Sequence, residues 1–207
     1  MVNWPSLESE AVKRHGRLGL IRHRRFEIRI AGFGGQGIVT IGKILGTAFS
    51  VYGGWNSVNT QSYGPESRGG ACRSEVVVSD GDINYPNVRK ADVLVTLSQV
   101  ALDTYVADIK DNAILLIDPQ AVSRVPEAGL FRLYRVPTIE IAHETGDIKC
   151  QNTVALGALY ALIANMVGEN ALLDAIKVSF PSATLGLNLA AFEHGKHYVQ
   201  SRLALEK

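Results

Sequence analysis

A cluster of glycines between a strand-like and a helix-like segment constrains the fold more than any other feature of this sequence. The cluster reads Gly32-Phe33-Gly34-Gly35-Gln36-Gly37, after the alternating residues 26–31 and before residues 38–50, whose apolar side chains recur at helical spacing. Glycine adopts positive φ and lets a ligand approach the backbone, so this arrangement suits a bound anion. The spacing also satisfies the dinucleotide-binding pattern G-x-G-x-x-G. A tight turn that packs helix on strand without a ligand explains the glycines equally well.

Strand-like and helix-like segments alternate along most of the chain, which predicts an α/β fold. Further strands are expected at residues 55–58, 71–79, 91–97, 113–117 and 131–136, and further helices at residues 99–109, 139–144, 152–167, 169–177 and 186–203. The turn signal Asp80-Gly81 predicts a β-hairpin that continues into a short strand at residues 83–85. We therefore expect a Rossmann-like three-layer domain with a mostly parallel sheet, a β-hairpin excursion and a helical C-terminal part.

Two segments carry more specific expectations. Glu27 and Arg29 alternate with apolar neighbours, whereas a central parallel strand usually has a continuous apolar run, so one face of the first strand should not be deeply covered. Residues 152–167 are apolar on nearly every side, which is typical of a helix at the centre of a domain or at a subunit interface. We favour the interface for this helix.

Composition narrows the class of protein. The chain has 207 residues, of which 46% are hydrophobic and 20% charged, as expected for one compact globular domain. The net charge of +1 argues against a general nucleic-acid binder. No apolar run is long enough to cross a membrane and no secretory signal is recognisable, so we expect a cytoplasmic protein. Residues 1–25 form a basic N-terminal extension that precedes the domain at residues 26–207; a solvated tail is favoured over binding to an acidic partner.

The cysteines and histidines do not predict a metal centre. Cys72 and Cys150 are far apart in sequence, so they cannot by themselves hold an iron–sulfur cluster or a structural zinc ion, and we expect two packing thiols. His143, His194 and His197 lack a third ligand nearby in sequence, which favours surface histidines over a metal site.

Two familiar classes of nucleotide-binding enzyme fit poorly. An NAD site of the Rossmann type requires an acidic residue about 20 positions after the glycines, where residues 57–61 contain no carboxylate. A P-loop requires a lysine followed by serine or threonine at the end of the glycine run, and this sequence has none there.

A second loop, Ser62-Tyr63-Gly64-Pro65-Glu66-Ser67-Arg68-Gly69-Gly70, adds polar groups that could bind a ligand. The Arg68 guanidinium suits a phosphate or a carboxylate, although a salt bridge to another subunit explains it equally well. Gln36 and Tyr63 could donate hydrogen bonds into an active site, and anchoring of their own loops is an equally good interpretation. No catalytic residue is assigned. The candidate binding residues are Gly34, Gly35, Gln36, Gly37, Tyr63, Ser67, Arg68 and Gly69.

The glycine motif, the second loop and the strand at residues 74–79 together resemble the gamma subunit of 2-oxoacid:ferredoxin oxidoreductases. The resemblance covers the chain from residue 26 onward, and the form of the second loop is most similar to the 2-oxoglutarate type. It implies an enzyme that converts a 2-oxoacid and coenzyme A to acyl-CoA and CO2 while reducing ferredoxin. This chain would be one subunit of it, inactive alone.

The resemblance also implies where the cofactors lie. Thiamine diphosphate, magnesium and iron–sulfur clusters would be held by partner alpha, beta and ferredoxin-like delta subunits, and none of them by this chain. The candidate binding residues would help to complete the active site and position coenzyme A. The isolated chain could also form a homodimer through residues 152–167. The alternative is a non-catalytic Rossmann-like scaffold, or a nucleotide-binding module, that only assembles partners.

Overall fold

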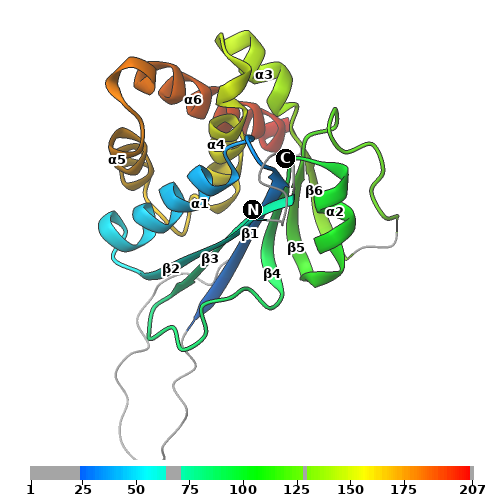
Figure 1. The fold of residues 1–207 in the computed structure, drawn as a ribbon, viewed down its shortest axis with the longest axis vertical. Helices are drawn as coiled ribbons and strands as arrows, with labels where there is room; N and C mark the ends of the chain where they lie inside the picture. Colours follow the sequence, from blue (N-terminus) through cyan, green and yellow to red (C-terminus); the bar gives the residue numbers. More distant parts are fainter. Residues whose placement is uncertain (1–23, 64–70, 128–129, 206–207) are drawn as a thin grey trace, which may run out of the picture.

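A six-stranded sheet forms the centre of the computed structural model, which describes residues 24–63, 71–127 and 130–205 (Figure 1). The strand order is β2-β3-β1-β4-β5-β6. The strands are β1 (Arg25–Phe33), β2 (Asn56–Tyr63), β3 (Ala71–Ser79), β4 (Ala91–Thr96), β5 (Ile109–Ile117) and β6 (Phe131–Arg135). Only β3 runs against its neighbours, and the pairs β1–β4, β4–β5 and β5–β6 are parallel. The expected mostly parallel sheet is confirmed.

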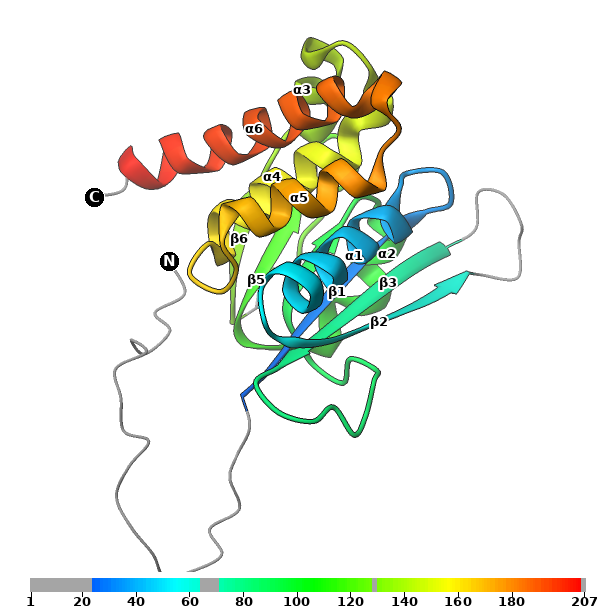
Figure 2. The same ribbon diagram turned by 90° about the vertical axis from the view of Figure 1, so that its left-hand side faces the viewer.

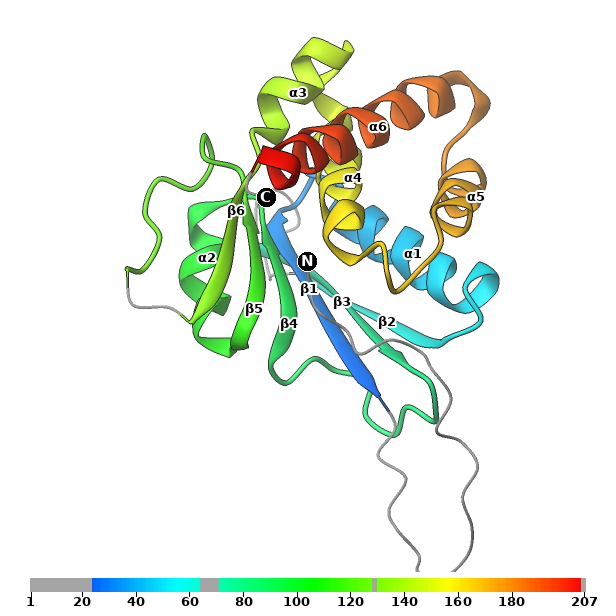
Figure 3. The same ribbon diagram turned by 180° about the vertical axis from the view of Figure 1, so that it is seen from behind.

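Helices cover both faces of the sheet and complete three layers. They are α1 (Ile38–Thr47), α2 (Gln99–Tyr105), α3 (Thr138–Thr145), α4 (Gln151–Ile163), α5 (Glu169–Ser179) and α6 (Ser182–Leu205), with a π-helical turn, Ala48–Tyr52, after α1. Figures 1 and 3 show α1, α4, α5 and α6 on one face and α2 on the other. The larger apolar core lies beneath α1 and α4, and a smaller one lies beneath α2. The helical C-terminal part is also as predicted.

The hairpin connects β2 with β3, not β3 with the segment that follows it. β2 and β3 pair in continuous register from Asn56 opposite Ser79 to Tyr63 opposite Cys72. The predicted strand at residues 83–85 is wrong, because these residues form no strand. β3 already pairs with β1 on one side and β2 on the other, so no edge remained for a third partner.

The polar side chains of β1 are buried, so the expectation of a weakly covered face is wrong. Glu27 and Arg29 are each only 4% exposed. Arg29 Nε donates to Glu75 Oε1 (2.8 Å), and Glu27 Oε2 accepts from the backbone N–H of Arg89 (3.0 Å) and of Lys90 (3.1 Å). The segment between β3 and β4 covers this face, and the buried charges remain because each has partners of opposite polarity.

α4 lies at the centre of the helical layer, beside α6 and in contact with α1 and α3 (Figure 2). Nearly all of its residues are buried within this one chain. A Cβ added at Gly157 would collide with the Phe192 carbonyl, and one at Gly195 would collide with the Val154 carbonyl, so the two backbones are in direct contact. The subunit-interface interpretation of this helix is wrong, because the chain's own elements already cover it.

Cys72 and Cys150 are buried free thiols, as expected, and burial raises the pKa of both. Among the described residues no helix is both long and apolar enough to span a membrane.

Candidate functional site

The glycine turn follows β1 at the point where the chain connections diverge. β1 and β4 are adjacent and parallel, but α1 leads from β1 toward β2 on one side, and α2 leads from β4 toward β5 on the other (Figure 1). In open α/β sheets, ligands bind outside the carboxyl ends of the strands at such a switch point. Residues 34–37 therefore occupy the position where this class of fold offers its binding crevice.

The backbone of this turn requires glycine at two positions. Gly35 has φ 99° and Gly37 has φ 71°, both in the left-handed region that other residues avoid. The Gln36 N–H donates to the Phe33 carbonyl (3.2 Å), which closes the turn, and Gly37 is the N-cap of α1. Because the first N–H groups of a helix have no intrahelical acceptor, this end of α1 can donate hydrogen bonds to an anion.

The Gln36 side chain fastens the turn to the neighbouring strand. Its Oε1 accepts from the Phe33 N–H (2.6 Å), and its Nε2 donates to the carbonyl of Leu97, just after β4 (2.9 Å). Of the two roles considered for Gln36, this geometry supports the anchoring of its own loop. The amide thus holds together the two strand ends on either side of the switch point.

A polar group at the start of α4 lies under the turn, and the sequence analysis did not identify it. The Asn152 side chain lies so close to Gly37 that a Cβ there would stand 2.7 Å from Asn152 Cγ. Asn152 Oδ1 accepts from the Thr153 N–H (2.9 Å), and Thr153 Oγ1 donates to Asn188 Oδ1 (2.7 Å). The signal in the sequence was a run of three polar residues, 151–153, at the start of an otherwise apolar helix.

Asp118 connects the end of β5 to the helices that follow. It is fully buried, and its Oδ2 accepts from Thr138 Oγ1 (2.6 Å) and from the Ile139 N–H (2.8 Å) at the start of α3. Gln151 Nε2 in turn donates to Thr138 Oγ1 (3.1 Å). This network fixes the N-termini of α3 and α4 at the same edge of the sheet as the glycine turn.

The second predicted cluster begins at the end of β2 and precedes β3. Ser67, Arg68 and Gly69 lie outside the described residues, as does the side chain of Tyr63. The register nevertheless places Ala71, the first residue of β3, opposite Phe33 at the end of β1. β3, which follows residues 64–70 in the chain, therefore begins next to the glycine turn.

The predicted surface histidines are exposed, and His194 Nδ1 is hydrogen-bonded to Thr145 Oγ1 (2.8 Å). Within the described part of the chain, no three His, Cys, Asp or Glu side chains gather as a metal site.

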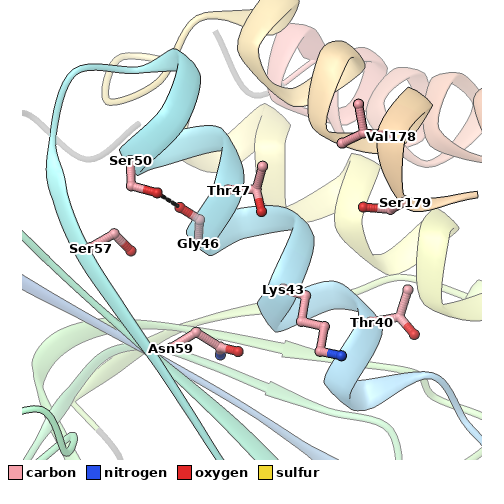
Figure 4. Close-up of a pocket in the computed structure, with 9 residues that line it drawn as sticks. All are labelled: Thr40, Lys43, Gly46, Thr47, Ser50, Ser57, Asn59, Val178 and Ser179. Atoms are coloured by element: carbon pink, nitrogen blue, oxygen red, sulfur yellow. Dashed lines mark hydrogen bonds between the residues drawn. The ribbon is translucent and has the colours of Figure 1, made fainter.

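A cavity of about 610 Å³ lies between α1, β2 and the end of α5 (Figure 4). The sequence analysis assigned none of its residues. Its lining comprises Thr40, Lys43, Gly46, Thr47, Ser50, Ser57, Asn59, Val178 and Ser179, with Lys43 as the charged member. Two of the hydroxyl groups are already used, since Ser50 Oγ donates to the Gly46 carbonyl (2.7 Å) and Ser179 Oγ to the Ala175 carbonyl (2.7 Å).

Comparison with known proteins gives consistent results. The chain matches the pyruvate ferredoxin/flavodoxin oxidoreductase family over residues 27–198. It is 47% identical over 176 residues to 2-oxoglutarate synthase subunit KorC of Methanocaldococcus jannaschii, covering 83% of this chain and 92% of that protein. It is 35% identical over 178 residues to ketoisovalerate oxidoreductase subunit VorA of Methanothermobacter thermautotrophicus, covering 85% of this chain but 37% of that protein.

Two solved structures share the fold. A keto/oxoacid ferredoxin oxidoreductase gamma subunit from Geobacter sulfurreducens has a TM-score of 0.78 at 38% identity, over 86% of this chain and 98% of that one. The 2-oxoglutarate:ferredoxin oxidoreductase from Magnetococcus marinus, with 2-oxoglutarate, coenzyme A and succinyl-CoA bound, has a TM-score of 0.76 at 26% identity, over 86% of this chain and 31% of that one.

Proposed function

Because this chain belongs to the pyruvate ferredoxin/flavodoxin oxidoreductase family, as a gamma subunit of a 2-oxoacid:ferredoxin oxidoreductase, we propose that it helps to complete the active site by positioning coenzyme A. Coenzyme A carries several phosphate groups, and the chain offers two features suited to phosphate near one another. One is the glycine turn at the N-terminus of α1, and the other is the loop that contains Arg68.

The observation that carries this proposal is the register of the sheet. Phe33 stands opposite Ala71, so the turn at residues 34–37 and the first residue of β3 lie at the same edge of the sheet, at the carboxyl end of β1. The same edge is the switch point between β1 and β4. Backbone N–H groups of Gly34, Gly35 and Gly37 would bind phosphate oxygens, with Arg68 adding a charge-assisted pair of hydrogen bonds.

The contribution of this chain is orientation of the coenzyme. Thiamine diphosphate with magnesium, on partner alpha and beta subunits, would supply the decarboxylation chemistry, and iron–sulfur clusters on a delta subunit would supply the electron transfer to ferredoxin. Binding the phosphates far from the thiol orients the coenzyme for acyl transfer, which lowers the entropic part of the barrier. Gln36 and Asn152 would keep the turn in shape without touching the coenzyme.

We propose 2-oxoglutarate as the 2-oxoacid. The KorC proteins from Methanocaldococcus jannaschii and Methanothermobacter thermautotrophicus are 47% and 44% identical to this chain, against 35% for the ketoisovalerate subunit VorA. Initial rates of the purified complex with 2-oxoglutarate, pyruvate and 2-oxoisovalerate test this choice, and a higher kcat/KM for either of the other acids would overturn it.

The coenzyme role is tested by Arg68→Gln in the reconstituted complex. Loss of a charge-assisted contact to phosphate should raise the KM for coenzyme A by about tenfold or more while the KM for the 2-oxoacid stays the same. Arg202→Gln, the same substitution on the exposed side of α6, is the matched control and should change neither constant. An unchanged KM for coenzyme A in Arg68→Gln would support the scaffold alternative instead.

A further inference from the structure

The two edges of the sheet differ in how they are protected. β6, at one edge, has only five residues, including Arg132 and Arg135, and the C-terminal part of α6 lies beside it (Figure 3). β2, at the other edge, has eight residues in unbroken register with β3. Its sequence, NSVNTQSY, contains no lysine, arginine, carboxylate or proline.

An edge of that kind is unusual in a protein that stays alone. Soluble proteins interrupt exposed edges with charges, prolines or bulges, because a row of unpaired N–H and carbonyl groups recruits other strands. Eight residues extend for about 26 Å, which is enough for a strand pairing of ordinary length. β2 therefore has the length and composition of an edge that is paired in the working protein.

Exposed apolar side chains and one unsatisfied hydroxyl group lie along the same edge. The π-helical turn, which contacts both β2 and α5, leaves Val51 67% exposed and Tyr52 42% exposed. Val178, on α5 at the rim of the cavity, is also 67% exposed. Ser57 Oγ, on β2, is buried and has no hydrogen-bond partner (Figure 4). Exposed apolar side chains around an incompletely satisfied polar groove are typical of a protein–protein interface.

We propose that β2 pairs edge to edge with a strand of another subunit of the oxidoreductase, and that this subunit presents a carboxylate to Lys43. Lys43 lines the cavity beside β2 and makes no ion pair within the described part of the chain. A second copy of this chain, paired antiparallel across β2, would bring another unpaired Lys43 to the same face. An acidic group on a different subunit complements Lys43, whereas a second copy repels it.

The lengths of the relatives favour the same occupant. This chain corresponds to 37% of VorA and to 31% of the Magnetococcus marinus chain, so in those proteins the same domain is joined to the rest of a larger polypeptide. Its neighbours there are other parts of the same enzyme. Where the gamma subunit is a separate polypeptide, a noncovalent interface has to replace this covalent connection.

Amide hydrogen exchange on the isolated chain and on the assembled complex tests the pairing. In the isolated chain, the outward N–H groups of β2, about every second one, should exchange rapidly, and in the complex they should become protected. β6 is the internal reference and should exchange equally in both samples. Unchanged exchange along β2 would overturn the proposal. So would β2 protection in the isolated chain together with a dimer mass, since a second copy would then be the occupant.

Paired substitutions provide the second test. Gln61 is exposed on β2, and Gln61→Lys adds the kind of charge that natural edges use to prevent pairing. It should weaken assembly of the chain with the remaining subunits by about tenfold without lowering its melting temperature. Gln200→Lys, the same change on exposed α6, should have no effect on assembly. Equal assembly of the two variants would contradict the pairing.

Lys43→Gln tests the carboxylate separately. It should weaken assembly and make the affinity less sensitive to added salt. If assembly of Lys43→Gln depended on salt as strongly as assembly of the unsubstituted chain, the proposed carboxylate opposite Lys43 would be contradicted. All three variants are scored by assembly, so their outcome is independent of the KM for coenzyme A.

Discussion

Gly37 satisfies two conditions that no other residue type meets. Its φ of 71° is left-handed, and the Asn152 side chain fills the space where a Cβ would stand. The turn, the start of α1 and the start of α4 are therefore fixed by one position. Asp118 has a similar role at the start of α3, because its buried carboxylate accepts three hydrogen bonds, from the Gln120 N–H, the Thr138 hydroxyl and the Ile139 N–H.

Gly37→Ala should lower the free energy of unfolding by about 2 kcal/mol or more, because the left-handed conformation alone costs an alanine about 1–2 kcal/mol and Asn152 must also move. Urea denaturation measures the change. Gly168→Ala is the control, since Gly168 has φ −67° and open space around its Cβ position. Equal stability of the two variants would contradict the assignment of Gly37 as a conformational requirement.

Asp118→Ala should cost about 3 kcal/mol, because the first-turn N–H of Ile139 in α3 and the buried Thr138 hydroxyl both lose their acceptor. The same denaturation experiment applies. Asp111, which is exposed on β5, provides the matched variant Asp111→Ala, with an expected change below about 0.5 kcal/mol. A small loss of unfolding free energy for both variants would contradict this prediction, because water would then serve as the hydrogen-bond acceptor in place of the Asp118 carboxylate.

At the scale of elements, the contact between α4 and α6 explains how an apolar helix can lie inside a chain of this size. Gly157 and Gly195 allow the two backbones to touch, and Tyr160 and Phe192 pack with their ring centroids 5.6 Å apart. Beside this contact, Lys196 forms ion pairs with Glu169, at the start of α5, and with Glu193 on α6.

Gly157→Ala and Gly195→Ala should each destabilise the protein by about 3 kcal/mol, near the upper end for overpacking, because the nearest atoms belong to the backbone of the facing helix and cannot rotate away. Gly186→Ala, on α6 with open space around its Cβ position, should instead gain up to about 1 kcal/mol from helix propensity. Thermal unfolding measures the order of stability of the three variants. A loss for Gly186→Ala equal to the others would contradict the close approach.

Lys196→Met should cost about 1 kcal/mol at neutral pH, and this difference should disappear in alkali. Burial lowers the pKa of Lys196, but hydrogen bonds to Glu169 and Glu193 outweigh it and raise the pKa above the usual 10.5. A folded-state pKa above the unfolded one stabilises the protein below the unfolded value, and the stabilisation is lost as pH rises through the folded value. Lys177→Met, at an exposed pair with Asp174, should cost less at every pH. A difference that stays constant as pH rises through the folded-state pKa of Lys196 would contradict this account.

At the scale of the whole molecule, the described residues offer a glycine turn that we propose binds phosphate and a sheet edge, β2, that we propose pairs with a partner, and they include no cluster of metal ligands. Because the proposed function assigns the cofactors to partner subunits, the isolated chain should show no 2-oxoacid-dependent reduction of ferredoxin, and adding it to the other subunits should restore turnover. It should also show no saturable binding of NAD, because residues 57–61 offer no carboxylate for the ribose. Isothermal titration measures the second expectation, and micromolar NAD binding would contradict it.

Particular residues show how much of this could be predicted. The glycine spacing and the polar loop at residues 62–70 predicted the family and the two candidate clusters, because local conformation and motif are properties of short segments. The partner of β3 was predicted wrongly, since strand pairing depends on which edges remain free across the sheet. Asn152 was missed because its role depends on Gly37, more than 100 positions away in the chain.

The sequence by itself determined the alternation of strands and helices, the left-handed glycine turn and the absence of a ribose-binding acid, all of which act over a few residues. Only the tertiary structure decided that Glu27 and Arg29 are buried, that α4 is central and that β2, among the described strands, pairs on one side alone. Each of these features depends on contacts between segments that are far apart in the sequence: the groups that pair with Glu27 and Arg29, the helices that pack around α4 and the strands that pair with β2. A local sequence pattern does not specify such contacts.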